Sequence, residues 1–436
     1  MNISRVPRSR GLSLLTVAAV GMLVATLGQT RVSTQTGKAS GRAVLFASAG
    51  SELARYDVDV NAATLTKRES TMLPGFVTEA TIHPSKQYVY IVWGKFVDGN
   101  PGGFQIHAKP HDLGMTAFRI DPATGALTTH GPSVSLGHSP GYVSAAATDV
   151  AGKYVLAVDS DPSRVSVHTL LPDGTIGKEV ASPGNRDFGI HAHQIRMDPS
   201  GQTVILPCRG DTLGGGKELP GSLQLLAFKD GILTQRQSIG PDQGFHFSAR
   251  HMDFHPSGKW DYFTTERQNK LLVYERLPNG SLGKQLYAVD TLGEPGNVRP
   301  EQIAGTVHVH PNGRIVYVAN RASGTTMVDG KPVFAGGENT IAVFSINQST
   351  GEPTLIQNID THGIHPRTFT IDPTSRMLVA GNTQQLPVKD GNTYRDLPAG
   401  MATYHMADDG TLEFVKKYDL PAGTNQIFWT GFVPLP

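Results

Sequence analysis

Arginine, histidine and glutamate side chains that could bind an anion and move protons recur at matching places along this sequence. Arg250 and Glu266 lie near the two ends of the segment 248–267, in which two apolar runs flank a Pro-Ser-Gly turn. The turn of a hairpin sets its register, so counting outward from the turn proline places Arg250 opposite Glu266. The same count gives five further pairs: Thr78 with Gly94, Ser144 with Ser160, His193 with Arg209, Gly305 with Arg321, and Arg367 with Thr383.

These pairs depend on a hairpin that recurs six times, with its turn proline, or Val150 in its place, at positions 84, 150, 199, 256, 311 and 373. A second strand-turn-strand pattern lies between successive copies, for example "YERLPNGSLGKQL". Two hairpins per repeat make four strands, which is the unit of a β-propeller blade. A partial pattern that begins with a strand near residues 43–48 and the tail "TNQIFWTGFVPLP" complete a seventh blade. We therefore predict an all-β, seven-bladed propeller over residues 39–436, closed by its N- and C-terminal strands.

Two other all-β arrangements compete with this prediction. WD40 repeats have a ~40–45-residue period and a Gly-His/Trp-Asp signature, both of which are absent here. Two packed β-sandwiches remain an alternative. The formal net charge of +1 over 436 residues gives no basic field for nucleic acid, so a charge-based function has to be local.

The N-terminus has the order of an export signal. Arg5, Arg8 and Arg10 precede an uncharged apolar stretch to about Gly28, which small and polar residues follow. We expect residues 1–38 to be a signal peptide and a short linker, and the protein to be periplasmic or secreted. An uncleaved membrane anchor is the alternative, because the apolar stretch approaches the ~18 residues of a spanning helix.

In a propeller the first strand of each blade lines the central channel, so the paired positions form a ring around one mouth. This ring holds His193, Arg209, Arg250, Glu266, Arg321 and Arg367. Unpaired cations gathered there are costly, and an anion would relieve that cost. In contrast, His83, His255 and His310 precede turn prolines at the opposite end and are interpreted as turn-shaping residues.

Metal and thiol chemistry have weaker support. His191 with His193, or His308 with His310, could bind a metal, but a third ligand at a convincing spacing is missing, so we expect no metal and no cofactor. Cys208 is the only cysteine, which excludes an intramolecular disulfide. It could be an activated thiol beside Arg209, although a small buried residue at a strand end is favoured.

Four stretches, "HAHQIRMDPSG", "ARHMDFHPSGKWDYFTTE", "VHVHPNGRIVYVANR" and "GIHPRTFTIDPTSRMLVAGN", resemble the seven-bladed lactonase family, which includes propeller-type 6-phosphogluconolactonase and carboxy-cis,cis-muconate cyclase. The resemblance implies a site of His193, Arg250, Glu266 and Arg321. Ala249 stands where the family usually has proline, and Thr306 where it has glutamate. Four long loops, 94–115, 209–222, 321–340 and 383–398, are expected to wall or cover the pocket.

The expected activity is hydrolysis, or reversible formation, of the lactone of a small anionic sugar or organic acid. His193 would be the base, at its ordinary pKa of ~6.5, and Glu266 would orient it or protonate the leaving alkoxide. Arg250 and Arg321 would stabilise the oxyanion, with His191, Arg209, His251 and Arg367 contacting substrate. The alternative is a non-catalytic exported propeller that binds a small anion or a protein partner. We expect a monomer.

Overall fold

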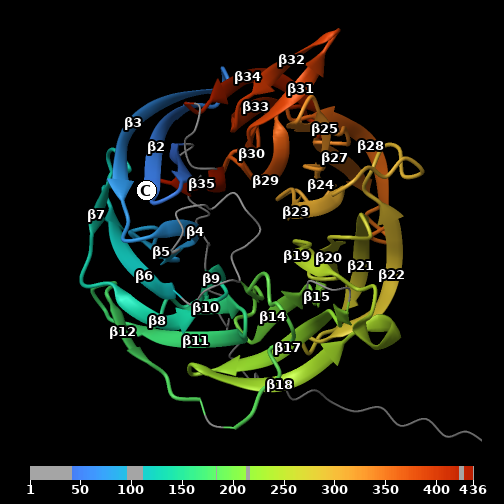
Figure 1. Cartoon of the computed structure of the whole chain (residues 1–436). Coiled ribbons are helices and arrows are strands. Elements are labelled where there is room, and N and C mark those ends of the chain that lie inside the picture. The colour runs from blue at the N-terminus through green and yellow to red at the C-terminus, as the bar shows by residue number, and fades with distance from the viewer. Residues whose placement is uncertain (1–41, 96–110, 183, 213–216, 422–426, 436) are drawn as a thin grey trace, which may run out of the picture. The chain divides into compact units, whose positions relative to one another are not determined.

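A computed structural model describes residues 42–95, 111–182, 184–212, 217–421 and 427–435, and these form seven antiparallel blades around a central channel (Figure 1). The six blades that follow one another along the chain comprise, from the innermost strand outward, β4 (Phe76–Ile82), β5 (Tyr88–Gly94), β6 (His111–Ile120) and β7 (Leu127–Thr129); β9 (Val143–Thr148), β10 (Tyr154–Ser160), β11 (Ser163–Leu170) and β12 (Ile176–Glu179); β13 (Arg196–Met197), β14 (Thr203–Cys208), β17 (Ser222–Lys229) and β18 (Ile232–Ile239); β19 (Ala249–Phe254), β20 (Trp260–Thr265), β21 (Lys270–Arg276) and β22 (Leu282–Asp290); β23 (Ile303–Val309), β24 (Ile315–Arg321), β27 (Thr340–Ile346) and β28 (Pro353–Asp360); and β29 (Ile364–Ile371), β30 (Met377–Gln384), β33 (Gly400–Met406) and β34 (Leu412–Asp419).

The seventh blade joins the two ends of the described chain. Its innermost strand is β35 (Ile427–Pro434), which pairs with β1 (Ala43–Ala49), followed outward by β2 (Glu52–Asp59) and β3 (Thr64–Met72). The predicted closure of the ring by both terminal strands is therefore confirmed. The first blade also carries an unpredicted strand, β8 (Val134–Ser139), which pairs with β6.

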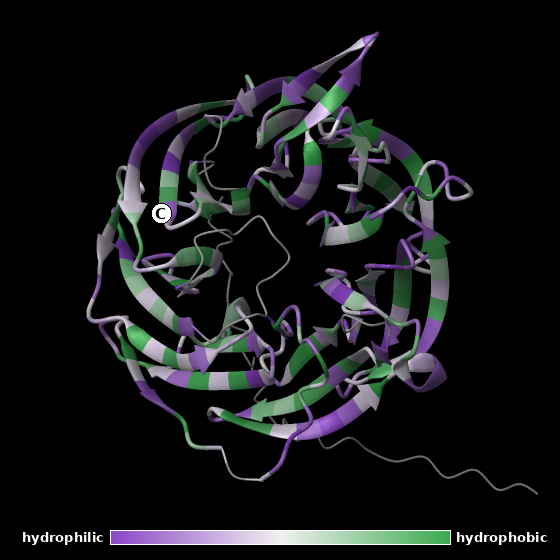
Figure 2. Ribbon diagram, viewed as in Figure 1, coloured by the Kyte–Doolittle hydropathy of each residue, from purple (hydrophilic) through white to green (hydrophobic). Residues whose placement is uncertain are grey.

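The second strand of each blade forms much of the core. Every residue of β14, β20 and β24 is buried, because these strands are covered by neighbouring blades on both faces. The outermost strands, such as β3 and β34, face water on one side and contain more polar residues, and Figure 2 shows hydrophilic and hydrophobic residues alternating along many strands. A stack of sheets with buried faces holds the innermost strands in place around the channel.

The turn histidines tie neighbouring blades together. His255 Nε2 donates to the carbonyl oxygen of Gly313, in the next blade's turn, at 2.7 Å, and His83 Nε2 donates to that of Gly152 at 3.0 Å. His310 Nδ1 accepts a hydrogen bond from the backbone N–H of Asn312 at 3.0 Å. These contacts agree with the turn-shaping interpretation and leave the three side chains engaged at the turns.

The predicted export signal, residues 1–38, lies outside the described residues. Within the part of the chain that the structure describes, no helix is long and apolar enough to cross a membrane.

Candidate functional site

All seven innermost strands carry an extra residue at a similar level of the channel. In β19 this residue is Arg250, which falls between the pairing partners Thr265 and Thr264. The equivalent irregularities in the other innermost segments lie at Thr78, Ser144, residues 193–195, residues 305–306, Arg367 and residues 428–429. Such β-bulges re-aim side chains, and strand neighbours that would otherwise point to opposite faces can then face the same side. Arg250 and His251 accordingly both line the channel.

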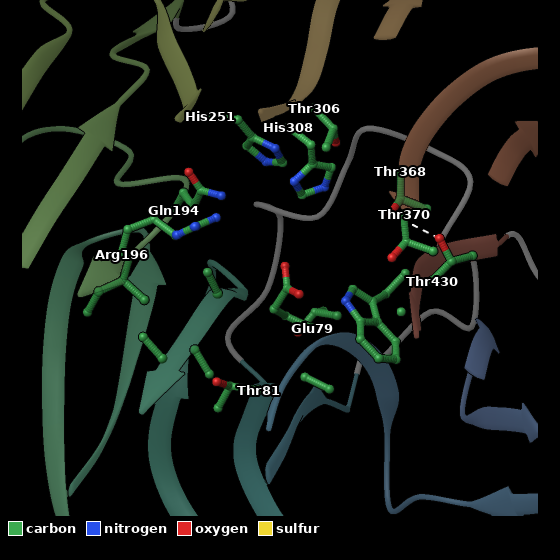
Figure 3. Close-up of a pocket in the computed structure, with 18 of the residues that line it drawn as sticks. Glu79, Thr81, Gln194, Arg196, His251, Thr306, His308, Thr368, Thr370 and Thr430 are labelled. Carbon is green, nitrogen blue, oxygen red and sulfur yellow. Dashed lines mark hydrogen bonds between the residues drawn. The ribbon is translucent and has the colours of Figure 1, made fainter. Parts of the chain in front are cut away.

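At this level the channel holds a cavity of ≈ 400 Å³, which we call the channel cavity. All seven innermost strands contribute to its wall, and its volume lies in the range of small-molecule sites. Its titratable and charged lining residues are Glu79, His193, Arg196, Arg250, His251, His308 and Arg367. Figure 3 shows Glu79 on one side of this space and Gln194, His251 and His308 on the other.

The bulges correct the predicted register. Glu266 does not pair with Arg250; its backbone N–H donates to the carbonyl oxygen of Ser248 at 2.7 Å. Part of the shift comes from the turn, since the ladder beside it pairs Phe254 with Asp261, one residue tighter than predicted. The bulge at Arg250 adds the second residue. The predicted pairs of Arg209 and Arg321 shift in the same way, so that their partners are His191 and Ile303.

Despite this shift, Glu266 gathers three arginine side chains into what we call the arginine cluster. Its Oε1 lies 3.6 Å from Arg209 Nη1 and 3.4 Å from Arg321 Nη2, and its Oε2 lies 3.4 Å from Arg250 Nε. Arg250 and Arg321 are each only 1% exposed. The resemblance brought Arg250, Glu266 and Arg321 together, and the structure places them in contact.

The cluster fixes the charge of its carboxylate. Burial opposes ionisation of Glu266, but Arg209, Arg321 and Arg250 outweigh it and lower its pKa to about 2. Burial, together with the like charge of Arg321, lowers the pKa of Arg250, and Glu266 only partly offsets this. Glu266 therefore remains ionised at neutral pH and orients guanidinium groups, so it does not fit the predicted role of acid for the leaving alkoxide.

Two histidines extend the cluster. Arg209 Nη2 donates to His191 Nδ1 at 3.3 Å, and Arg321 Nη1 donates to His365 Nε2 at 3.1 Å. Sequence reasoning missed His365, although it follows Gly363 and Ile364 directly before the Pro-Arg pair. Both histidines have left-handed backbone, with φ of 54° and 60°, which directs their rings toward the arginines rather than along the strand.

His193 lies at the cavity wall as predicted, but in a different electrostatic environment. Its Nδ1 is buried without a hydrogen-bond partner among the described residues, and its ring centroid is 5.0 Å from that of His251. Burial and the charge of Arg250 lower its pKa well below the ordinary value. The pKa of His251 is lowered well below its ordinary value by the same two causes. His193 is therefore neutral over a wider pH range than expected.

Arg367 reaches the cavity through its bulge. Its guanidinium carbon lies 3.6 Å from the ring centroid of Phe428, a cation–π contact that leaves it without a carboxylate partner among the described residues. Thr306, which replaces the family's usual glutamate, donates its hydroxyl to the carbonyl oxygen of Arg367 at 2.9 Å. The departure from the family thus serves to position this bulge.

The opposite side of the cavity contains carboxylates that sequence reasoning missed. Asp253 pairs with Arg196 at 2.7 Å and with His308 Nδ1 at 3.6 Å. Glu79 accepts a hydrogen bond from the Trp429 side chain, and burial raises its pKa to about 7. The only sequence signal for Glu79 was its place one residue after Thr78, and without the bulge that place points away from the channel.

The remaining predictions concern loops, metal and thiol. Three of the four long loops contain short hairpins, β15–β16 (Asp211–Thr212, Glu218–Leu219), β25–β26 (Thr325–Val328, Lys331–Phe334) and β31–β32 (Leu386–Asp390, Thr393–Leu397). None of the described residues of these hairpins lines the cavity, contrary to the prediction of a lid. Most of the fourth loop, residues 96–110, lies outside the described residues.

Among the residues that the structure describes, no group of three or more His, Cys, Asp or Glu side chains could hold a metal ion. Cys208 is buried, its thiol lies 3.2 Å from the carbonyl oxygen of Phe188, and burial raises its pKa to about 12. This environment agrees with a packed residue rather than an activated thiol.

Comparison with known proteins places this geometry in a family. Residues 36–388 match the family model described as "Lactonase, 7-bladed beta-propeller". The 6-phosphogluconolactonase of Bacillus subtilis (strain 168) is 30% identical over 280 residues, covering 62% of this chain and 71% of the relative. The 6-phosphogluconolactonase of Pectobacterium carotovorum subsp. carotovorum (strain PC1) is 25% identical over 323 residues, covering 74% and 82%.

A solved structure supports the fold independently. The periplasmic gluconolactonase PpgL of Pseudomonas aeruginosa superimposes with a TM-score of 0.67 over 90% of this chain and 99% of the neighbour, at 17% sequence identity. At that identity the likeness concerns the fold alone. Together with the family match over most of its length, these observations show that the chain belongs to the lactonase family of seven-bladed β-propellers.

Proposed function

We propose that this protein hydrolyses the lactone of a small anionic sugar acid or organic acid in the channel cavity. The observation that carries this proposal is Arg250, which lines the cavity, is held on its far side by Glu266 and has a buried Nη1 without a hydrogen-bond partner among the described residues. A fixed guanidinium with an unused N–H is suited to an oxygen that gains negative charge during ester hydrolysis.

The charge balance favours an anionic ligand. Four guanidinium groups, those of Arg209, Arg250, Arg321 and Arg367, lie around Glu266 and the cavity, and Glu266 is the only carboxylate paired with any of them in the described part of the chain. Buried cations without counter-charges are destabilising. A carboxylate or phosphate on the substrate would offset this cost near Arg367, while Arg250 contacts the lactone carbonyl.

His193 supplies the base in this scheme. Because its pKa is lowered, its imidazole is in the basic form at neutral pH, and its unpartnered Nδ1 faces a space where water can bind. The imidazolium formed when it takes a proton from water would be costly beside Arg250, but the oxyanion that forms in the same step compensates that charge. Glu266 contributes by holding the arginines.

The family relationship supports a sugar-acid lactone. The relatives are named for 6-phosphogluconolactone hydrolysis, and the solved neighbour is described as a periplasmic gluconolactonase. We propose in addition that residues 1–38 direct export, in which case an aldonic lactone is easier to supply than a sugar phosphate. N-terminal sequencing of the protein recovered from fractionated cells tests this, since a mature protein that retains Met1 would contradict cleavage.

The proposal is tested by measuring acid release from a panel of lactones, together with calorimetric titration of the corresponding hydroxy acids. His193→Gln should lower turnover about 10²–10⁴-fold while ligand affinity changes much less, because the amide keeps hydrogen bonding but cannot take a proton. His138→Gln, at a 60% exposed side chain outside the cavity, is the matched control and should retain full activity. Tight anion binding without hydrolysis would instead favour a non-catalytic binding protein.

A further inference from the structure

The proposed reaction needs an acid that the arginine cluster lacks. When a lactone opens, its ring oxygen leaves as an alkoxide, which is far more basic than water's working range and requires a proton. Glu266 stays ionised beside three arginines, and the rings of His193 and His251 are neutral and surrounded by cations. None of these groups carries a proton that it readily gives up at neutral pH.

Glu79 is the carboxyl group of the cavity without a cationic partner. Asp253 is paired with Arg196 and His308, and Glu266 with three arginines, whereas no ion pair of Glu79 occurs among the described residues. Its hydrogen-bond partners are the Trp429 side chain and the backbone at Ala80. A carboxyl in this position is free to change its protonation state, in contrast to the two paired ones.

The position of Glu79 suits proton donation into the cavity. It follows the bulge in β4 and lines the cavity, and Figure 3 shows its carboxyl group pointing from β4 toward His251 and His308 across the space. His193 belongs to a different blade, and the blade of β9 lies between them in chain order. A lactone in the cavity can therefore be approached by a base from one wall and by an acid from another.

We propose, on the basis of the function proposed above, that Glu79 is the general acid that protonates the ring oxygen as the lactone opens. A water molecule bonds to the carbonyl carbon and gives a proton to His193. The bond from that carbon to the ring oxygen then breaks, and the ring oxygen takes the proton of the Glu79 carboxyl group. The products are a hydroxyl and a carboxylic acid on one molecule, and both side chains regain their starting protonation states by exchange with solvent.

The charged surroundings of Glu79 are compatible with this role. Burial is the main influence that keeps its carboxyl protonated near pH 7, and Arg196 and Arg367 act weakly in the opposite direction. The other titratable groups that line the cavity across from it are His193, Arg250, His251 and His308. β9 contributes Ala145 to Thr148 and β35 contributes Phe428 to Phe432, none of which titrates in this range.

The leaving group provides the decisive test. We compare a lactone with the matching thiolactone, whose leaving thiolate does not need protonation, using the wild type, Glu79→Gln and His193→Gln. Glu79→Gln should lose about 10²–10⁴-fold in kcat on the lactone but less than about tenfold on the thiolactone, while His193→Gln should lose activity on both. Equal losses of Glu79→Gln on both substrates would overturn the acid role and indicate positioning alone.

The pH profile is a second readout. The wild-type kcat/KM, corrected for spontaneous hydrolysis, should fall as pH rises through about 7, because the acid must be protonated, and this fall should be absent in Glu79→Gln. Glu413→Gln, at an exposed residue of β34, is the matched control and should behave as the wild type. Thermal unfolding of each variant separates misfolding from lost chemistry, and Glu79→Asp supplies a second carboxyl variant should Glu79→Gln not fold.

The outcomes separate this inference from the proposed function. A wild type that hydrolyses no lactone removes the proposed function itself. A wild type that is active and loses neither rate nor its alkaline limb in Glu79→Gln or Glu79→Asp leaves lactone hydrolysis in place and removes Glu79 from it.

Discussion

Two buried glutamates at the channel end up with opposite properties. Glu266 lies among three guanidinium groups and has a pKa of about 2, whereas Glu79 has an indole N–H as its side-chain partner and a pKa of about 7. Burial acts in the same direction on both, so the difference comes from the charges around them. A carboxylate held among cations is suited to organising them, and one without cations is suited to exchanging a proton.

Removing the anion of the arginine cluster should have the largest effect. Glu266→Gln leaves Arg209, Arg250 and Arg321 buried without a counter-charge, so we expect a loss of about 3–5 kcal/mol in the free energy of unfolding. Activity should fall by roughly 10³-fold or more, because the guanidinium groups repel each other and leave the oxyanion position. Denaturant unfolding and steady-state kinetics check this, and an unchanged unfolding midpoint would show that the cluster tolerates its own repulsion.

A smaller change keeps the charge of the cluster and removes its geometry. Arg250→Lys retains a cation but cannot contact Glu266 and an oxyanion at the same time through a planar fork, so kcat/KM should fall by about 10–100-fold. The free energy of unfolding should change less than in Glu266→Gln. Wild-type kinetics in Arg250→Lys would mean that charge alone suffices at this position.

The pH dependence of stability should distinguish the two glutamates directly. Glu79 has a folded-state pKa of about 7 against 4.5 for the free side chain, so its stabilising contribution is present below pH 4.5 and is lost as pH rises through about 7. Between these limits the wild type should lose about 2 kcal/mol more unfolding free energy than Glu79→Gln. Denaturant unfolding across this pH range measures the difference, and parallel curves would contradict the assigned environment.

Glu266 should show the opposite sign. Its folded-state pKa is lowered from 4.5 to about 2, so its contribution is present above pH 4.5 and disappears as pH falls toward 2. The stability difference between the wild type and Glu266→Gln should therefore shrink in acid, whereas the difference for Glu79→Gln shrinks in the direction of neutral pH only if Glu79 is ionised in the folded protein at all values tested.

The smallest expected effect concerns the hydrogen bond to Glu79. The Trp429 side chain lowers the pKa of Glu79 slightly, so Trp429→Phe should raise it and move the alkaline limb of kcat/KM upward by roughly half a pH unit. The turnover on the plateau should be nearly unchanged. A downward shift would show that Trp429 acts on Glu79 in some way other than donating a hydrogen bond.

The propeller could be predicted because its signals are local and repeated. Turn residues recur at the first hairpin of six blades, the apolar runs have the length of strands, and the two incomplete patterns at the ends are complementary. The pairing of β1 with β35 follows, since an open ring would expose strand edges. Strand β8 was missed because its short run, interrupted by Gly137, lacks the alternation that marks a strand.

The site was predictable only in part, because the bulges are not visible as a pattern in one sequence. Equal spacing from the turns brought Arg250, Glu266 and Arg321 to one end of the channel, although not into the register that was expected. Glu79 escaped notice because an unbulged strand would point it away from the channel. The pKa of His193 could not be anticipated either, since it depends on burial and on charges from other blades.

Acid release from lactones by the purified full-length protein, followed in a pH-stat, tests the central claim most directly. The account predicts saturable hydrolysis of at least one sugar-acid or organic-acid lactone, competitive inhibition by the hydroxy acid product, and loss of the reaction in Arg250→Lys and His193→Gln. Hydrolysis no faster than the spontaneous rate across the panel, with the same hydroxy acids bound tightly in calorimetric titrations, would contradict it.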